Sequence, residues 1–443
     1  MSGVEIGLIS IGAILLLIYL GMHVAVTLCV VSLIGVWAVK GNVTLATKLL
    51  AIAAYDTVAG YVFGVVPLFV LMGLLVSVSD LGKDAYVVAN ILMRRIRGGL
   101  GIATVAANAV FAAVTGISVA SAAVFTKLAV PEMISLGYRP RFAVGVVAGS
   151  SVLGMLIPPS LLLIVYALLA EQSIGDLFIA GIVPGILLSF AFAIAILGMA
   201  TFLPRTVMRE EAAGEEAGDA ASGEPVESIG AAVFRLWPLP VLVFAVIGGI
   251  YLGWFTPTES GAVGALGALI LAFARRKLTW ANVWQVLVET GHVTVSILML
   301  IIAANIYTRL LALSGVPVFI NDFVNGLEFG FFTLLIFYAV IIVIMGTILD
   351  GISIMLIMIP IFLPLLEGYN VDLVWFGIVT VIAVEIGLLT PPLGLSAYVI
   401  KSTLDTDEIS LADIFIGAAP FAVVMFVVLL LIIFFPWLVT GYG

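Results

Sequence analysis

Long apolar runs follow one another along the whole chain, separated by short polar or glycine-rich stretches. The N-terminal half predicts spans near residues 5–20, 22–39, 60–79 and 178–203, with an interrupted run near 99–136 and a broken run near 142–170 before the last of them. Runs of about 20 apolar residues match the roughly 30 Å hydrocarbon core of a bilayer. The pattern predicts an all-α polytopic membrane protein, because no segment alternates as the strands of a membrane β-barrel do.

Two of the apolar runs contain a pair of adjacent prolines. The first pair lies in "GMLIPPSL" at residues 154–161 and the second in "GLLTPPLG" at residues 387–394. Proline lacks an N–H and clashes with the preceding turn, which costs roughly 3 kcal/mol inside a helix. We therefore expect two broken helices within the membrane, near 142–170 and 374–400.

One hydrophilic stretch divides the chain into nearly equal halves. Residues 205–235 are rich in Glu, Ala and Gly and read as an acidic cytoplasmic linker between a first unit at 1–204 and a second at 236–443. Similar segments recur in the same order in both halves: "TGISVASAAVF" and "GTILDGISIM", Gly137–Tyr138 and Gly368–Tyr369, the two proline pairs, and "DLFIAGIVP" and "DIFIGAAP". The order indicates an internal repeat.

The glycine-rich interruptions point to re-entrant hairpins. Lys83, Arg94, Arg95 and Arg97 precede the run near 99–136, and Arg139 and Arg141 follow it. Because basic residues concentrate on cytoplasmic loops, both ends of this run are assigned to the cytoplasm. Two full crossings would also return the chain to that side, but the polar tip and Ala/Gly-rich arms favour a hairpin packed within protein.

With the first hairpin, each half crosses the membrane about five times, so the second half starts from the opposite side. The sequence thus predicts two inverted-topology repeats, each with a re-entrant hairpin and a broken helix. The second hairpin is expected near 331–366 and the last span near 414–437. Both termini are predicted to be periplasmic, although Lys40 and Lys48 do not fit the charge rule.

Composition agrees with this class and excludes others. The 443 residues are 63% hydrophobic and 10% charged, and the one cysteine, Cys29, rules out an internal disulfide framework. No G-x-x-x-x-G-K-[ST] motif provides a nucleotide site for an ATP-driven pump, and no second aspartate pairs with Asp350 as in an intramembrane protease. We therefore expect a transport protein and not an enzyme. A channel can use similar hairpins, and saturable, Na⁺-gradient-dependent uptake would distinguish a transporter from it.

Broken membrane helices expose backbone groups that persist only where they line a cavity or bind something. Unwound carbonyls and hydroxyls suit a weakly held monovalent cation such as Na⁺. The candidate Na⁺-binding residues at the tips and breaks are Gly116, Ser118, Ser121, Gly149, Ser150, Gly154 and Pro158 in the first half and Gly346, Thr347, Gly351, Gly387, Thr390 and Pro391 in the second. The alternative is that these small residues only allow close packing or a kink.

Three further polar residues are candidates for substrate binding or coupling. Asp350, at the second tip, either contacts a cation or substrate or caps the helix that follows. Arg309 either pairs with a substrate carboxylate or extends to the membrane interface. Ser160 follows the first proline pair directly.

With these residues in view, the chain resembles the large membrane subunit, of the DctM type, of tripartite ATP-independent periplasmic (TRAP) transporters. The resemblance rests on "PLFVLMG" (67–73), "SVASAAVFTKLAVPEMISLGY" (118–138), "GSSVLGMLIPPS" (149–160), "GWFTPTESGAVGA" (253–265), "DGISIMLIMIPIFLP" (350–364) and "GLLTPPLG" (387–394). Together these segments cover essentially the whole chain in order.

The resemblance implies Na⁺-coupled uptake of an organic acid across the bacterial inner membrane, with no cofactor besides the coupling ion. It also implies an elevator-like motion of a domain that contains both hairpins. The implied partners are a small membrane subunit, expected as a separate chain, and a soluble periplasmic receptor that delivers substrate; nucleic acid is not among them.

Overall fold

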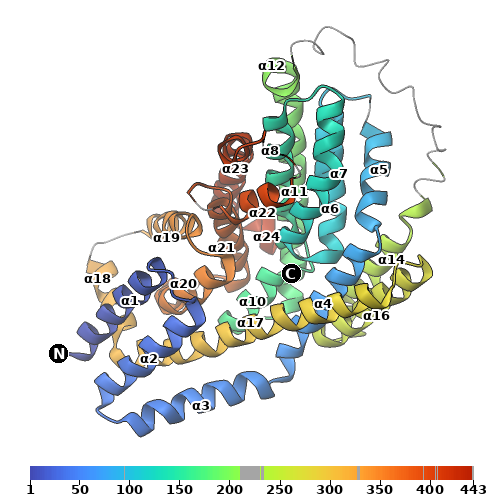
Figure 1. Ribbon diagram of the computed structural model, residues 1–443. Coiled ribbons are helices and arrows are strands. Elements are labelled where there is room, and N and C mark those ends of the chain that lie inside the picture. The colour runs from blue at the N-terminus through green and yellow to red at the C-terminus, as the bar shows by residue number, and fades with distance from the viewer. Residues whose placement is uncertain are drawn as a thin grey trace.

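The protein was analysed as a computed structural model of the 443-residue chain (Figure 1). It describes all residues except 94, 210–229, 231–233, 327–329, 393, 405, 407 and 442–443. Regular structure in the described part is helical, and the one β-bridge there joins Tyr138 to Met208. The expected all-α class is confirmed. Most of the acidic linker, Arg94 of the charge pattern and Leu393 of the second proline motif lie outside the described residues.

The helices of the N-terminal half are α1 (Gly3–Tyr19), α2 (Val24–Lys40), α3 (Val43–Ala59), η1 (Tyr61–Gly64), α4 (Val65–Val78), α5 (Leu81–Met93), α6 (Gly99–Thr115), α7 (Ser118–Ser135), α8 (Pro140–Ser151), α9 (Leu153–Leu156), α10 (Leu161–Ala170), α11 (Ile174–Phe202) and α12 (Pro204–Val207). Helices α3 and α5 were not among the expected spans. Each carries too many polar residues to read as a membrane run, and α5 is amphipathic.

The C-terminal half contains α14 (Pro238–Val243), the π-helical turn η2 (Phe244–Gly248), α15 (Gly249–Tyr251), α16 (Pro257–Ala274), α17 (Trp280–Ser314), α18 (Val316–Gly326), α19 (Phe331–Gly346), α20 (Gly351–Leu366), η3 (Glu367–Tyr369), α21 (Leu373–Leu388), α22 (Leu395–Thr403), α23 (Leu411–Phe434) and α24 (Trp437–Thr440). The peptide bonds Pro158–Pro159 and Pro391–Pro392, between α9 and α10 and between α21 and α22, are cis.

Several of these helices can span a bilayer. By length and composition, the described residues contain five such helices: Tyr61–Val78, Ile174–Phe202, Pro257–Ala274, Trp280–Ser314 and Leu411–Phe434. Pro140–Leu156 and Leu161–Ala170, bent by 41° at the first proline pair, form a sixth if they are one broken span. Shorter apolar helices accompany them, so the chain is a multi-pass membrane protein.

Helix ends follow local sequence chemistry. Ser173 and Ser410 cap α11 and α23 by accepting hydrogen bonds from the N–H groups of Asp176 and Asp413. Thr256 and Glu259 form a capping box at the start of α16, so the Glu259 side chain fixes the start of that helix.

The two halves share one interior. Figure 1 shows α17 as a long helix that runs across the lower part of the molecule, and it contacts α1, α2 and α3 as well as α4. Helix α23 packs on α8, where glycines allow the backbones to touch: a Cβ on Gly145 would lie 2.2 Å from the carbonyl oxygen of Gly417. A continuous set of buried apolar side chains therefore runs through both halves.

Candidate functional site

The first hairpin tip is seated against the first helix break. Gly116 ends α6 with a φ of 66°, in the left-handed region, and its carbonyl accepts a 3.2 Å hydrogen bond from the N–H of Leu161 at the start of α10. A Cβ on Gly116 would lie 2.4 Å from the carbonyl oxygen of Pro159. A Cβ on Gly154, just before the break, would lie 3.1 Å from the carbonyl group of Ile117 at the tip. Tip and break thus meet backbone to backbone.

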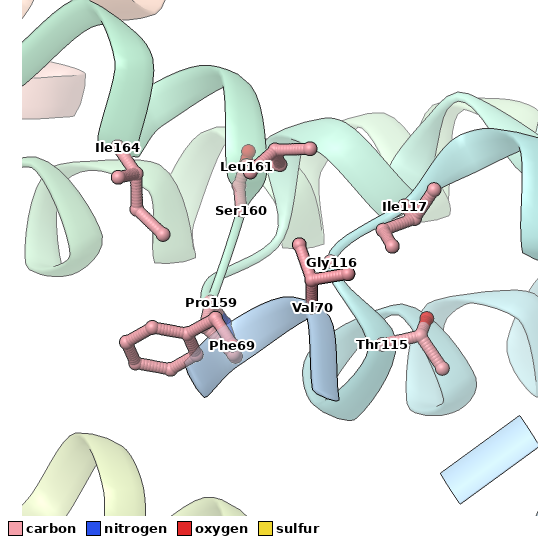
Figure 2. Close-up of a pocket in the computed structure, with 9 residues that line it drawn as sticks. All are labelled: Phe69, Val70, Thr115, Gly116, Ile117, Pro159, Ser160, Leu161 and Ile164. Atoms are coloured by element: carbon pink, nitrogen blue, oxygen red, sulfur yellow. The ribbon is translucent and has the colours of Figure 1, made fainter. Parts of the chain in front are cut away.

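A cavity of about 10 Å³ lies at this junction, roughly the space of one water molecule. Figure 2 shows Gly116 and the segment from Pro159 to Leu161 at its wall, with Phe69 and Val70 of α4 nearby. Ser160 closes the break: its hydroxyl donates to the carbonyl of Met155 and accepts from the N–H of Leu163 at 3.3 Å. The junction therefore gathers backbone carbonyls, one hydroxyl and the N-terminus of a half-helix.

Buried hydroxyls continue away from the tip along the first hairpin. Ser118 is buried at the start of α7, and the buried Ser121 hydroxyl has no hydrogen-bond partner among the described residues. Ser150 of α8 accepts a 2.6 Å hydrogen bond from the side-chain amide of Asn108 on α6 and donates to the carbonyl of Val146 at 2.7 Å. Ser150 therefore ties α8 to the hairpin arm.

Two residues of the first set have other surroundings. A Cβ on Gly149 would lie 2.4 Å from the ring of Phe421, so Gly149 faces α23 and not the tip. Pro158 belongs to the break itself and is half of the first cis pair. The structure thus brings Gly116, Ser160 and Gly154 together and leaves Gly149 apart.

The second tip meets the second broken helix in a similar way. A Cβ on Gly346 would lie 2.6 Å from the Cα of Gly387, so α19 and α21 touch through this glycine pair. A Cβ on Gly351 would lie 2.8 Å from the side chain of Val384 and 3.3 Å from that of Leu162 on α10. Packed neighbours therefore fill the space beside all three glycines, so none of these positions admits a larger side chain.

Two threonines flank this contact. Thr347 donates its hydroxyl to the carbonyl of Ile344 at 2.8 Å, and Thr390 donates to that of Ile386 at 2.7 Å. Each oxygen keeps free lone pairs for a cation. Pro391 follows Thr390 and is exposed.

Asp350 lies between α19 and α20 and is exposed. Its Oδ1 accepts hydrogen bonds from the N–H groups of Ile352 and Ser353, each at 3.1 Å, and its Oδ2 accepts from the Ser353 hydroxyl. This is the capping geometry given above as one of its two roles. A carboxylate has about four acceptor positions, so the cap leaves room for a further ligand.

Arg309 lies on α17 and faces α3. Its guanidinium donates to the carbonyl of Leu49 at 3.1 Å and to Asp56 at 3.5 Å, both on α3. The structure therefore places Arg309 in the contact between α3 and α17.

The hairpins and broken helices interlock across the two halves. Helix α10, after the first break, packs on α20 of the second hairpin, and α22, after the second break, packs on α7 of the first. The sequence did not predict these contacts between the hairpin of one half and the broken helix of the other. Sequence reasoning also missed Asn108 and the buried Glu385 of α21, although a carboxylate within an apolar run was a readable signal.

Comparison with known proteins settles the family. The sequence model described as "Tripartite ATP-independent periplasmic transporter, DctM component" matches residues 11–438. The chain belongs to this family. As a DctM component it is a transporter permease subunit and not an enzyme, and the resemblance found in the sequence is confirmed.

Similar proteins carry different substrate names. The C4-dicarboxylate TRAP transporter large permease protein DctM of Pseudomonas aeruginosa is 32% identical, over 88% of each chain. The ectoine TRAP transporter large permease protein TeaC of Halomonas elongata is 30% identical over 95% of each. The sialic acid TRAP transporter permease protein SiaT of Haemophilus influenzae is 27% identical over 96% of this chain and 66% of its own.

A solved structure shares the fold. The Alcanivorax borkumensis YdaH transporter superposes with a TM-score of 0.61 at 12% identity, covering 90% of both chains. At this identity the similarity concerns architecture alone, and the DctM assignment rests on the sequence matches.

Proposed function

We propose that this DctM component forms the translocation pathway of a Na⁺-coupled secondary transporter that takes up an organic acid across the bacterial inner membrane. The observation that carries the proposal is the seating of the Gly116 tip against the Pro158–Pro159 break. Irregular backbone at membrane depth is stable only where protein or a bound species satisfies it. Family membership and the names of relatives, which include C4-dicarboxylate and sialic acid transporters, support an organic acid as substrate.

We also propose that the two halves are inverted repeats, as the odd number of expected crossings requires. The order of elements supports this. Each half has an amphipathic helix before its hairpin, α5 or α18, then a broken helix, and then a long helix capped by serine. Each long helix is followed by a four-residue helix beside a proline, α12 or α24. In this proposal hairpins and broken helices move together in an elevator-like step, and both termini are periplasmic.

The interlocked helices support such a common motion. Because α10 packs on α20 and α22 on α7, neither hairpin can be displaced far without the broken helix of the other half. If the two hairpins and the two broken helices move as one rigid group, that group would carry substrate and cation across the membrane together. Helices α1 and α2, with α17, would belong to the stationary part, which would hold the small membrane subunit while a periplasmic receptor delivers substrate.

The proposal includes two cation sites, one in each half. The first is assigned to the backbone around Gly116 and Gly154, the hydroxyl of Ser160 and the nearby Ser118. The second is assigned to Thr347, Asp350 and Thr390. Hydroxyls and carbonyls at tips and breaks supply the oxygen ligands that Na⁺ accepts, and a single carboxylate is consistent with a weakly held monovalent ion.

The test is uptake by the reconstituted system. This chain and its small subunit would be reconstituted into liposomes, and the periplasmic receptor would be added to the external solution. A panel of labelled organic acids, including a C4-dicarboxylate, would then be tested as substrates. We expect saturable, receptor-dependent uptake that requires an inward Na⁺ gradient. Asp350→Ala and Thr390→Ala should each lower this uptake at least tenfold while membrane insertion continues, a loss of about 1.4 kcal/mol or more.

Glu289→Gln, which alters an exposed carboxylate on α17, is the matched control and should keep wild-type uptake. Full coupled uptake by Asp350→Ala and Thr390→Ala would remove the second cation site from the proposal. If uptake by the wild-type protein does not depend on the Na⁺ gradient, the proposed Na⁺ coupling is wrong.

A further inference from the structure

Glu385 is a carboxylate in the protein interior without a partner. It lies on α21, about 18 Å along the helix from Leu373 at 1.5 Å per residue, and a little less than two turns before the second proline pair. The residue is 1% exposed, and neither Oε1 nor Oε2 has a hydrogen-bond partner among the described residues. The exposed Asp350 of the second tip, by contrast, has both oxygens bonded.

The surroundings of α21 offer no positive charge. The helices that pack on it are α9, α10, α11, α19, α20, α23 and α24, and none of these described segments contains Lys, Arg or His. Their titratable residues are Tyr166, Tyr338, Asp176 and Asp413. Tyr166 donates to the carbonyl of Leu373, Tyr338 bonds Thr380, Asp413 pairs with Arg141, and Asp176 is exposed at the start of α11.

A buried carboxylate in this setting cannot keep its charge uncompensated. Moving an ionised carboxylate out of water costs several kcal/mol even after the protein relaxes, and no side chain on the described helices that pack on α21 offsets that cost. The compensating positive charge must therefore come from solution. An ionisable residue within a membrane-embedded helix is by default a candidate for such a function.

The position of Glu385 connects it to the second hairpin. The preceding residue, Val384, meets Gly351 of the tip, and Gly387, two residues later, touches Gly346. Any displacement of α19 and α20 would thus change the packing of the helix turn that carries Glu385. Its access to water would change with the position of the hairpin.

We propose that Glu385 binds one monovalent cation, Na⁺ or a proton, during the transport cycle. This inference rests on the proposed transport function and adds a cation site that is separate from the two tip sites. In the packing described here the carboxylate holds that cation. A local opening of the second tip against α21, within the group of helices that moves together, admits water and lets the cation exchange.

Cation linkage to folding tests the site without knowledge of the substrate. The purified chain would be unfolded reversibly with SDS in mixed micelles, over two decades of NaCl with choline chloride keeping ionic strength constant, and separately over a range of pH. One bound cation raises the folded-to-unfolded ratio by up to about tenfold for each tenfold increase in its free concentration. We expect Glu385→Gln to remove one such dependence while Glu289→Gln, the exposed control, leaves it intact.

The two sources give different results. Loss of the NaCl dependence in Glu385→Gln identifies Na⁺, and loss of the pH dependence identifies a proton. Glu385→Met, which keeps similar volume without a carboxylate, should behave as Glu385→Gln does and covers the case in which the amide fails to fold. If both variants retain the full wild-type dependence on NaCl and pH, Glu385 is a permanently neutral structural residue and the proposal is overturned.

The tip site can be separated in the same assay. Asp350→Asn should lose a part of the NaCl dependence that Glu385→Gln keeps. If Asp350→Asn loses it and the Glu385 variants lose nothing, the tip site stands and the Glu385 site falls. If the Glu385 variants lose a dependence and Asp350→Asn does not, the tip site falls and the Glu385 site stands.

Discussion

Replacing Gly116 by alanine would press a methyl group into the contact between the first tip and the first break. Gly116 has a φ of 66°, and a Cβ there would lie 2.4 Å from the carbonyl oxygen of Pro159. A left-handed conformation costs a non-glycine residue about 1 kcal/mol. Overpacking against a neighbour that is backbone and cannot rotate away adds about 1–3 kcal/mol.

The substitution therefore destabilises the conformation in which the tip contacts the break by about 2–4 kcal/mol, relative to conformations in which the tip is displaced. At 1.4 kcal/mol per factor of ten, the seated population should drop by about 30- to 1000-fold relative to positions in which the tip is displaced. The hydrogen bond from Leu161 to the Gly116 carbonyl would be lost with it. We expect Gly116→Ala to insert into the membrane but to lose most gradient-driven uptake in reconstituted liposomes.

Gly41 provides a matched control. Its φ is 65°, close to that of Gly116, but a Cβ there meets nothing within 4 Å. Gly41→Ala therefore carries the backbone cost of about 1 kcal/mol without the steric one and should keep near-normal uptake. Wild-type uptake by Gly116→Ala, or equal losses in both variants, would refute the idea that tip seating against Pro159 is required.

Two further substitutions address contacts between the halves. Gly145→Val should lower the free energy of unfolding by about 3 kcal/mol or more and reduce the yield of folded protein, because even its Cβ would lie 2.2 Å from the Gly417 carbonyl oxygen. Gly198→Ala, at a position with open space around it, should leave both unchanged. Thermal unfolding in detergent measures the difference between the two variants. Arg141→Gln breaks the 2.7 Å ion pair with Asp413, whose side chains are 53% and 28% exposed. It should cost no more than about 1 kcal/mol, and the effect should shrink at high salt, so a large, salt-independent loss would show that the pair is more deeply coupled.

Local sequence chemistry determined much of this protein. The proline pairs interrupt helices because two adjacent prolines remove two successive N–H donors, whereas single prolines such as Pro184 and Pro420 lie inside helices. The serine and threonine caps lie where the sequence places them. Runs of apolar residues determined the membrane class. The motifs at residues 118–138, 149–160 and 350–364 pointed to the DctM family, which the family match confirms.

Other features depended on contacts that no local pattern specifies. Helices α3, α5 and α18 have no long apolar run to reveal them. The space beside Gly149, Gly346 and Gly387 is filled by neighbours that are distant in the sequence. Arg309 offered two roles by sequence and bonds α3 in the fold. Glu385 stands out only once every packed helix is known to lack a cation. Sequence specifies what each residue can do within a turn or two, whereas the pairing of distant helices decides which of those capacities is used.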